Sequence, residues 1–172
     1  MDAPSLLPAA FYDLSRYPYT EILETADEDI TSRPLPPCPS SLSMADMQRL
    51  CLGKETSQNT ITSLITAMGS SQSVRQAQSS THSHFRKANL ASVCVSAAAC
   101  RKDFSELVEL ATQHYLFDRE RGCYDPLYVA EELGQLKSAE FSECKACAKS
   151  LETWATKERE RMWKLIPSWF RL

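Results

Sequence analysis

Glycine is scarce in this chain, and neither sign of charge is in large excess. Only four of the 172 residues are glycine, so the glycine-rich loops that cradle phosphates would be hard to build. The formal net charge is −3, whereas a nucleic-acid surface needs an excess of lysine and arginine. The apolar runs fall well short of the roughly 18 residues that a transmembrane helix needs. We therefore expect neither nucleic acid nor membrane among the partners of this chain.

The sequence motifs of common enzymes are also missing. The chain contains no GxSxG nucleophile elbow, no P-loop and no HExxH metalloprotease motif. A thiol or a serine beside His114 is the best candidate for nucleophilic catalysis, but this histidine falls on a regular amphipathic helix. The adjacent acids Glu131 and Glu132 fit a solvated helix surface better than an acid–base pair. We expect no enzyme activity and no catalytic residue.

The start of the chain and its cysteines point to a location inside the cell. Residues 1–4 carry no basic region and no long apolar run follows them, so we expect no signal peptide. Seven cysteines are an odd number, which argues against a complete set of disulfides. Because nothing in the sequence indicates secretion, we expect these thiols to be reduced, buried or bound to metal. We therefore expect an intracellular protein.

Apolar residues at three- and four-residue spacing predict an all-α fold. Ser43 and Asp125 are the clearest expected N-caps, and the proline after Asp125 suits the first helical position. Asp103 is a further expected N-cap, Gly53 is an expected helix end, and Pro167 is expected to end the last helix. The expected helices span residues 6–17, 43–53, 61–69, 103–118, 125–136 and 142–165.

These helices predict an irregular bundle of five to six helices in two parts. Residues 1–69 are the N-terminal helical segment, with a proline-rich loop around residues 33–39. Residues 70–84 are rich in serine and glutamine and have almost nothing to bury, so we expect a flexible linker there. Residues 85–172 are expected to form a more compact C-terminal bundle.

Cys144 and Cys147 form the only pair with the spacing of metal ligands. Residues i and i+3 share a helix face, so both thiolates could bind one tetrahedral zinc ion. His114 and Cys123 are the preferred candidates for the other two ligands, and Cys94 and Cys100 are second choices. The alternative, which we expect, is that Cys144 and Cys147 are small core residues, with His114 elsewhere and no cofactor.

The last residues of the chain are rich in large aromatic side chains. Trp163, Trp169 and Phe170 follow a helix whose charges alternate in sign. They could close the domain as a buried hydrophobic latch, which we favour, because tails of small domains become ordered by docking. They could instead form an anchor for a partner, because tryptophan is enriched in interface hot spots.

Three segments resemble one family in the same order along the chain. Residues 6–16 (LLPAAFYDLSR), 42–55 (LSMADMQRLCLGKE) and 144–172, from Cys144-x-x-Cys147 to WKLIPSWFRL, resemble the region after the BTB (POZ) domain in proteins of mushroom-forming (basidiomycete) fungi. The BTB domain itself is absent from this chain, so its dimerisation and cullin binding are not implied. The resemblance implies a region without an activity that can be assigned to particular residues.

The residues and the resemblance together lead to two hypotheses. We expect a non-catalytic helical protein-interaction module, like the C-terminal part of a BTB-type adaptor. The alternative is a regulatory domain stabilised by structural zinc, held by Cys144 and Cys147 with His114 and Cys123. Metal analysis of the purified protein separates the two.

Overall fold

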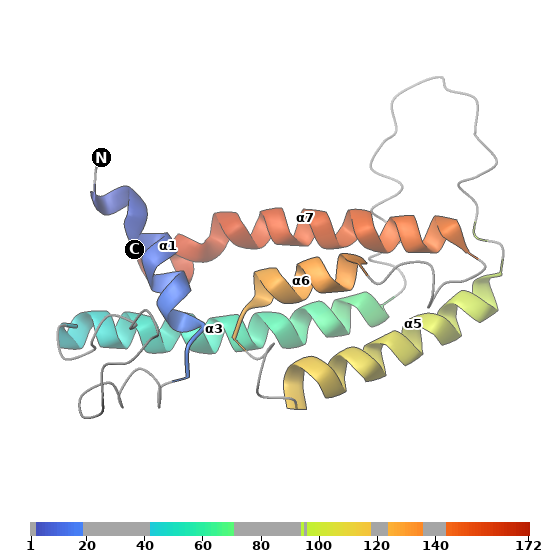
Figure 1. The fold of residues 1–172 in the computed structure, drawn as a ribbon, viewed down its shortest axis with the longest axis horizontal. Helices are drawn as coiled ribbons and strands as arrows, with labels where there is room; N and C mark the ends of the chain where they lie inside the picture. Colours follow the sequence, from blue (N-terminus) through green and yellow to red (C-terminus); the bar gives the residue numbers. More distant parts are fainter. Residues whose placement is uncertain (1–2, 19–41, 71–93, 95, 118–123, 136–143) are drawn as a thin grey trace, which may run out of the picture.

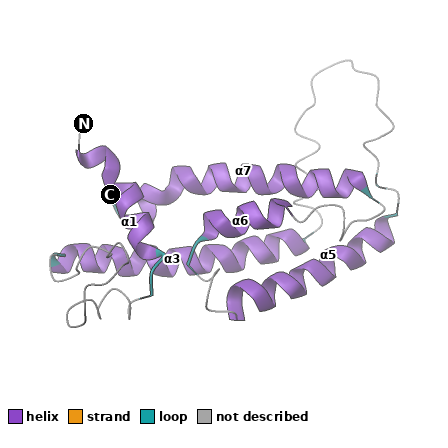
Figure 2. Ribbon diagram, in the orientation of Figure 1, coloured by secondary structure: helices purple, strands orange, loops and turns teal. Residues whose placement is uncertain are grey.

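The computed structural model describes residues 3–18, 42–70, 94, 96–117, 124–135 and 144–172. These residues form α-helices and one π-helical turn, and none of them belongs to a strand (Figure 1, Figure 2). The all-α class predicted from the sequence is confirmed. The elements are α1 (Ala3–Ser15), α3 (Met44–Gly69), α5 (Ala97–Thr112), η3 (Gln113–Phe117), α6 (Pro126–Gln135) and α7 (Lys145–Trp169).

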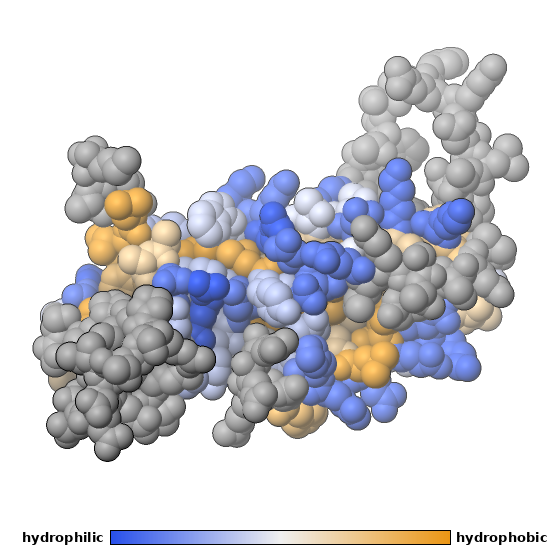
Figure 3. All heavy atoms as spheres, viewed as in Figure 1, coloured by the Kyte–Doolittle hydropathy of each residue, from blue (hydrophilic) through white to orange (hydrophobic). Residues whose placement is uncertain are grey.

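The two longest helices, α3 and α7, lie side by side and run in opposite directions (Figure 1). α5 packs along α3, α6 packs along α7, and α1 crosses the end at which α3 begins and α7 finishes. Hydrophilic side chains cover much of the outer surface of α5 and α7 in Figure 3, as expected of amphipathic helices. Described residues from both predicted parts, 1–69 and 85–172, belong to one hydrophobic core. Apart from Ser70, the predicted linker 70–84 lies outside the described residues, as does the proline-rich loop.

α3 is one helix of 26 residues, where the sequence predicted two that were separated after Gly53. Its N-cap is Ser43, as predicted, because the Ser43 hydroxyl accepts a hydrogen bond from the backbone N–H of Asp46 at 3.1 Å. Gly53 continues the helix and is buried against the ring of Phe170. The prediction that Gly53 ends a helix is therefore wrong, and the glycine instead allows close packing by a distant residue.

Replacing Gly53 with alanine is expected to destabilise the protein although alanine is the better helix former. A Cβ atom at this position would lie 1.8 Å from Cε1 of Phe170, so the ring would have to move. Overpacking of this kind costs about 1–3 kcal/mol. Urea unfolding of Gly53→Ala and of Gln58→Ala, an exposed position on the same helix, measures the difference. A Gly53→Ala protein as stable as the Gln58→Ala control would contradict the packing argument.

The start of α6 was predicted correctly from local sequence, and the start of α5 was not. Asp125 caps α6 as expected, because its carboxylate accepts a hydrogen bond from the backbone N–H of Tyr128 at 2.9 Å. α5 begins earlier than predicted, since its N-cap is Ser96 and Asp103 lies within the helix. The α5 start was missed because the sequence before Asp103 is small and apolar, without charged residues until Arg101.

The C-terminal end of α7 closes the core. The helix runs to Trp169, so Pro167 lies in its last turn and does not end it as predicted. Trp169 and Phe170 are buried, and the ring of Phe170 lies 5.5 Å from that of Phe11 in α1, centroid to centroid. These two residues form the predicted latch between α7, α1 and α3. Trp163, the third aromatic residue of the tail, is 58% exposed.

Candidate functional site

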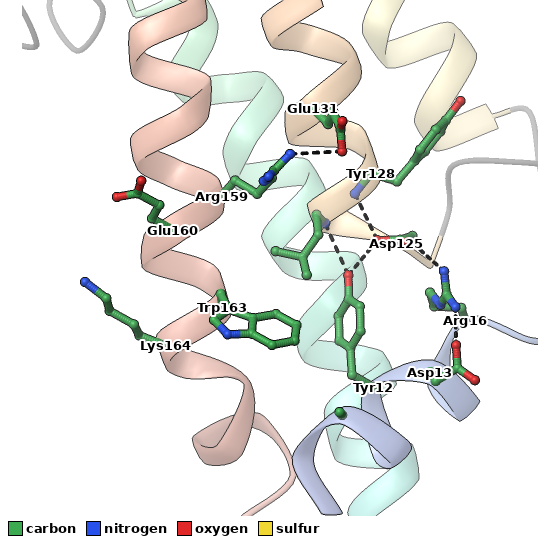
Figure 4. A pocket seen from close by; sticks show the side chains of 12 residues that line it. Tyr12, Asp13, Arg16, Asp125, Tyr128, Glu131, Arg159, Glu160, Trp163 and Lys164 are labelled. Carbon is green, nitrogen blue, oxygen red and sulfur yellow. Dashed lines mark hydrogen bonds and ion pairs between the residues drawn. The ribbon is translucent and has the colours of Figure 1, made fainter. Parts of the chain in front are cut away.

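An open groove of about 970 Å³ lies between α1, α6 and α7, and we call it the α1–α6–α7 groove (Figure 4). Its residues come from one turn or two of each helix, including Ala9, Tyr12, Leu127 and Trp163. The indole of Trp163 projects from α7 toward Tyr12 (Figure 4). An exposed tryptophan at the wall of an open groove is the most conspicuous apolar feature of this surface.

Asp125 organises the floor of the groove. Its Oδ1 accepts hydrogen bonds from the hydroxyl of Tyr12 at 2.6 Å and from the backbone N–H of Tyr128 at 2.9 Å. Its Oδ2 accepts one from Nη1 of Arg16 at 3.2 Å, and Arg16 also pairs with Asp13. Burial and the neighbouring Asp125 carboxylate raise the pKa of Tyr12, so its hydroxyl stays protonated and keeps its role as donor.

Charged side chains of both signs line the groove. Glu131 of α6 pairs with Arg159 of α7 at 3.0 Å, and Glu160 and Lys164 lie on the same helix as Arg159. In all, three cationic and four anionic side chains line it: Arg16, Arg159, Lys164, Asp13, Asp125, Glu131 and Glu160. None of the described lining residues is a cysteine, histidine or serine. The groove therefore offers hydrogen-bonding groups, charges of both signs and apolar contact.

A second candidate site is a cluster of four cysteines at the opposite end of α7. The Sγ atoms of Cys94, Cys100, Cys144 and Cys147 all lie within 4.8 Å of one another, and those of Cys94 and Cys100 are 3.5 Å apart. Cys100 and Cys144 are buried, and the other two are half-buried. Burial and the neighbouring thiols raise the pKa of Cys100 to about 11, and the same causes raise that of Cys147. Any metal bound here would have to displace thiol protons.

The structure brings together a different set of cysteines from the one preferred on sequence grounds. Cys144 and Cys147 are in the cluster, and Cys94 and Cys100, the second choices, accompany them. His114 is exposed on η3, where its ring lies 4.7 Å from that of Tyr115, and it is not in the cluster. Cys123 lies outside the described residues. Cys144 is buried and Cys147 packs against the hydrophobic core, while both also lie beside the thiols of Cys94 and Cys100.

A scan against protein-family models, a search of curated proteins and a search of solved structures find no match to this chain. Among the helices of the described residues, none is long and apolar enough to cross a membrane.

Proposed function

We propose that this chain is a non-catalytic helical module that binds a segment of another protein in the α1–α6–α7 groove. The observation that carries the proposal is Trp163, a large aromatic side chain that is 58% exposed at the wall of an open groove. Tryptophan supplies more binding energy than most residues when a partner buries it, and it is enriched in interface hot spots. Single exposed apolar residues are common, but this one faces a groove with a fixed polar floor.

The chemistry of the lining favours a polypeptide as the occupant. A nucleic acid or another polyanion would need a surface with a clear positive excess. The groove instead carries three cations and four carboxylates around an apolar strip formed by Ala9, Leu127 and Trp163. A peptide with an apolar or aromatic anchor and flanking side chains of both signs complements this lining. Mixed polar rims around an aromatic centre are typical of protein–protein interfaces.

The acids of the groove support a binding role over a catalytic one. Asp125 already accepts three hydrogen bonds, and Glu131 is paired with Arg159. Carboxylates held in this way position the floor and walls, and they are poorly placed to exchange protons with a substrate. The groove is therefore proposed as a recognition surface.

The resemblance to the region after a BTB domain is consistent with this proposal, because such a region would be the partner-facing half of an adaptor. None of the five described cysteines forms a disulfide, which is compatible with the proposed intracellular location. A regulatory domain with structural zinc, the competing hypothesis, is compatible with partner binding too. The four thiols lie at the start of α7, whereas the groove lies beside its C-terminal half.

The experiment selects ligands for the full chain from a random peptide library and measures their affinity for two variants. Trp163→Ala is expected to weaken the selected peptides at least about tenfold, as loss of a hot-spot residue does. Leu110→Ala is the matched control, because Leu110 is an apolar residue of α5 with 60% exposure that does not line the groove. It should leave the affinity unchanged.

Two binding results would contradict the proposal, and one feature of the selected sequences would count against it. One is a library that yields no peptide for the folded chain. The other is a set of peptides that bind Trp163→Ala as tightly as the original protein, since their binding site would then lie elsewhere. Selected sequences without any apolar anchor would also count against the groove.

A further inference from the structure

Four cysteines from separate parts of the sequence meet at the end of the bundle where α5 and α7 begin (Figure 1). Cys94 lies just before α5, Cys100 is the fourth residue of α5, and Cys144 and Cys147 lie at the start of α7. We propose that these cysteines bind one Zn²⁺ ion as four thiolates and that the ion is structural. The proposal goes beyond partner binding in the α1–α6–α7 groove and does not depend on it.

The spacing of the thiols suits a single metal ion. Zinc binds thiolate sulfur at about 2.3 Å, and a regular tetrahedron of that size has sulfur–sulfur edges of about 3.8 Å. The four Sγ atoms lie within 4.8 Å of one another, and the Cys94–Cys100 pair is 3.5 Å apart. Small side-chain rotations therefore suffice to surround one ion. An iron–sulfur cluster spreads its thiolates over two or more metal atoms and would hold them farther apart.

The backbone around the cluster favours negative charge. Four thiolates and one Zn²⁺ ion carry a net charge of −2, which is costly beside a core unless it is compensated. Cys144 is the N-cap of α7 and Cys147 lies in its first turn, while Cys100 lies near the start of α5. The sulfurs therefore lie near the positive ends of both helices.

The donor set also indicates what the ion would do. Four thiolates are soft ligands that select zinc over calcium or magnesium, which take oxygen. Four protein ligands complete the tetrahedron and leave no open position for water or substrate, as in structural zinc sites. The half-buried Cys94 and Cys147 give the ion a path to the site from solvent. The ion would tie the start of α5, which packs on α3, to the start of α7, which packs on α6.

The same cysteines could instead be small core residues with no ligand. That explanation does not predict that four of the five described cysteines should gather at one point, half of them only partly buried. Cys51, the fifth, is exposed on α3 and is not in the cluster. It therefore provides a matched control for every cysteine substitution.

The test measures metal in the full chain, purified under reducing conditions from cells supplied with zinc. Elemental analysis should give one zinc per chain, and X-ray absorption at the zinc edge should show a shell of four sulfurs at about 2.3 Å. Cys100→Ser and Cys147→Ser should each lose stoichiometric zinc, whereas Cys51→Ser should keep it. Replacing zinc with Co²⁺ should give the intense visible absorption of tetrahedral cobalt thiolate, and Cys51→Ser should give the same spectrum.

The wild-type spectra keep the proposal testable even where a serine variant fails to fold. Nitrogen or oxygen in the ligand shell would overturn the four-thiolate site, and so would iron as the bound metal. Zinc well below one ion per chain in the wild type, with no tetrahedral cobalt spectrum, would overturn metal binding altogether. Trp163→Ala should retain its zinc, since that residue is remote from the cluster along α7.

Discussion

Deletion of residues 162–172 is expected to abolish the cooperative unfolding transition of this protein. The segment contains four large side chains that are almost fully buried: Met162, Ile166, Trp169 and Phe170. Burial of each such side chain contributes roughly 1.5–3 kcal/mol, so their loss removes about as much free energy as holds a typical domain folded. Thermal unfolding followed by circular dichroism measures the effect. A truncated protein that melts at the original temperature would show that the tail is a dispensable docking peptide.

A pair of point substitutions tests the same idea with less disruption. Phe170→Ala removes a ring that lies against Gly53 of α3 and 5.5 Å from the ring of Phe11 in α1, so it leaves a cavity where three helices meet. Such changes cost about 3–5 kcal/mol. Trp163→Ala removes a larger aromatic side chain from the same tail, but that side chain is 58% exposed, and we expect a change within about 0.5 kcal/mol. Equal costs for the two variants would contradict the assignment of Phe170 to the latch and of Trp163 to the groove.

The features that the sequence predicted correctly depend on residues close together in the chain. The N-caps Ser43 and Asp125 act on backbone groups within three residues, so their chemistry is visible in a short window of sequence. Amphipathic spacing likewise identified the apolar faces of the helices and hence the all-α class. The tail was predicted to form a latch, and Trp169 and Phe170 are buried as that prediction requires.

The features that the sequence analysis did not predict depend on residues far apart in the chain. Glycine is typical of helix ends, so the sequence predicted an end at Gly53. The close contact with Phe170, more than a hundred residues later in the chain, explains why a glycine lies within the helix instead. Pro167 was expected to end a helix, but a proline in the last turn loses only one backbone hydrogen bond, and packing of Trp169 outweighs that loss. Local preference was overridden by tertiary contact in both cases.

Of the four cysteines in the candidate metal site, only Cys144 and Cys147 were preferred as ligands on sequence grounds, for the same reason. The close spacing of Cys144 and Cys147 can be read from one helical turn, but the partners of this pair depend on which helix start lies beside α7. His114 was preferred because it flanks the charged turn just upstream of the cysteine pair in the sequence, yet its position on η3 takes it away from the cluster. Cys94 and Cys100 were only second choices, because the sequence analysis did not predict that α5 starts between them, with its N-cap at Ser96.

Removal of zinc is expected to lower the melting temperature of the wild-type protein by about 5–10 °C, provided that the four thiols bind it as proposed. A ligand present at a hundredfold excess over its dissociation constant stabilises the folded state by about 2.7 kcal/mol. For a chain of this length, each kcal/mol shifts the midpoint by about 2–4 °C. Melting curves with and without a strong zinc chelator, under reducing conditions, measure the shift. Cys51→Ser should respond to the chelator as the wild type does. Cys147→Ser should melt at a lower temperature than the wild type, and the chelator should not change that temperature.

The part of the protein that is destabilised by zinc removal is as informative as the size of the decrease in melting temperature. Zinc bound by these cysteines would hold together the starts of α5 and α7, while the far end of the bundle is held by Phe170, Gly53 and the contacts of α1. Hydrogen exchange after chelation should therefore speed up first at the backbone amides of residues 97–101 and 145–149. The buried amides of α3 around Gly53 should stay protected. Uniform loss of protection across all helices would mean that the metal governs global folding, and unchanged exchange at both helix starts would mean that no metal links them.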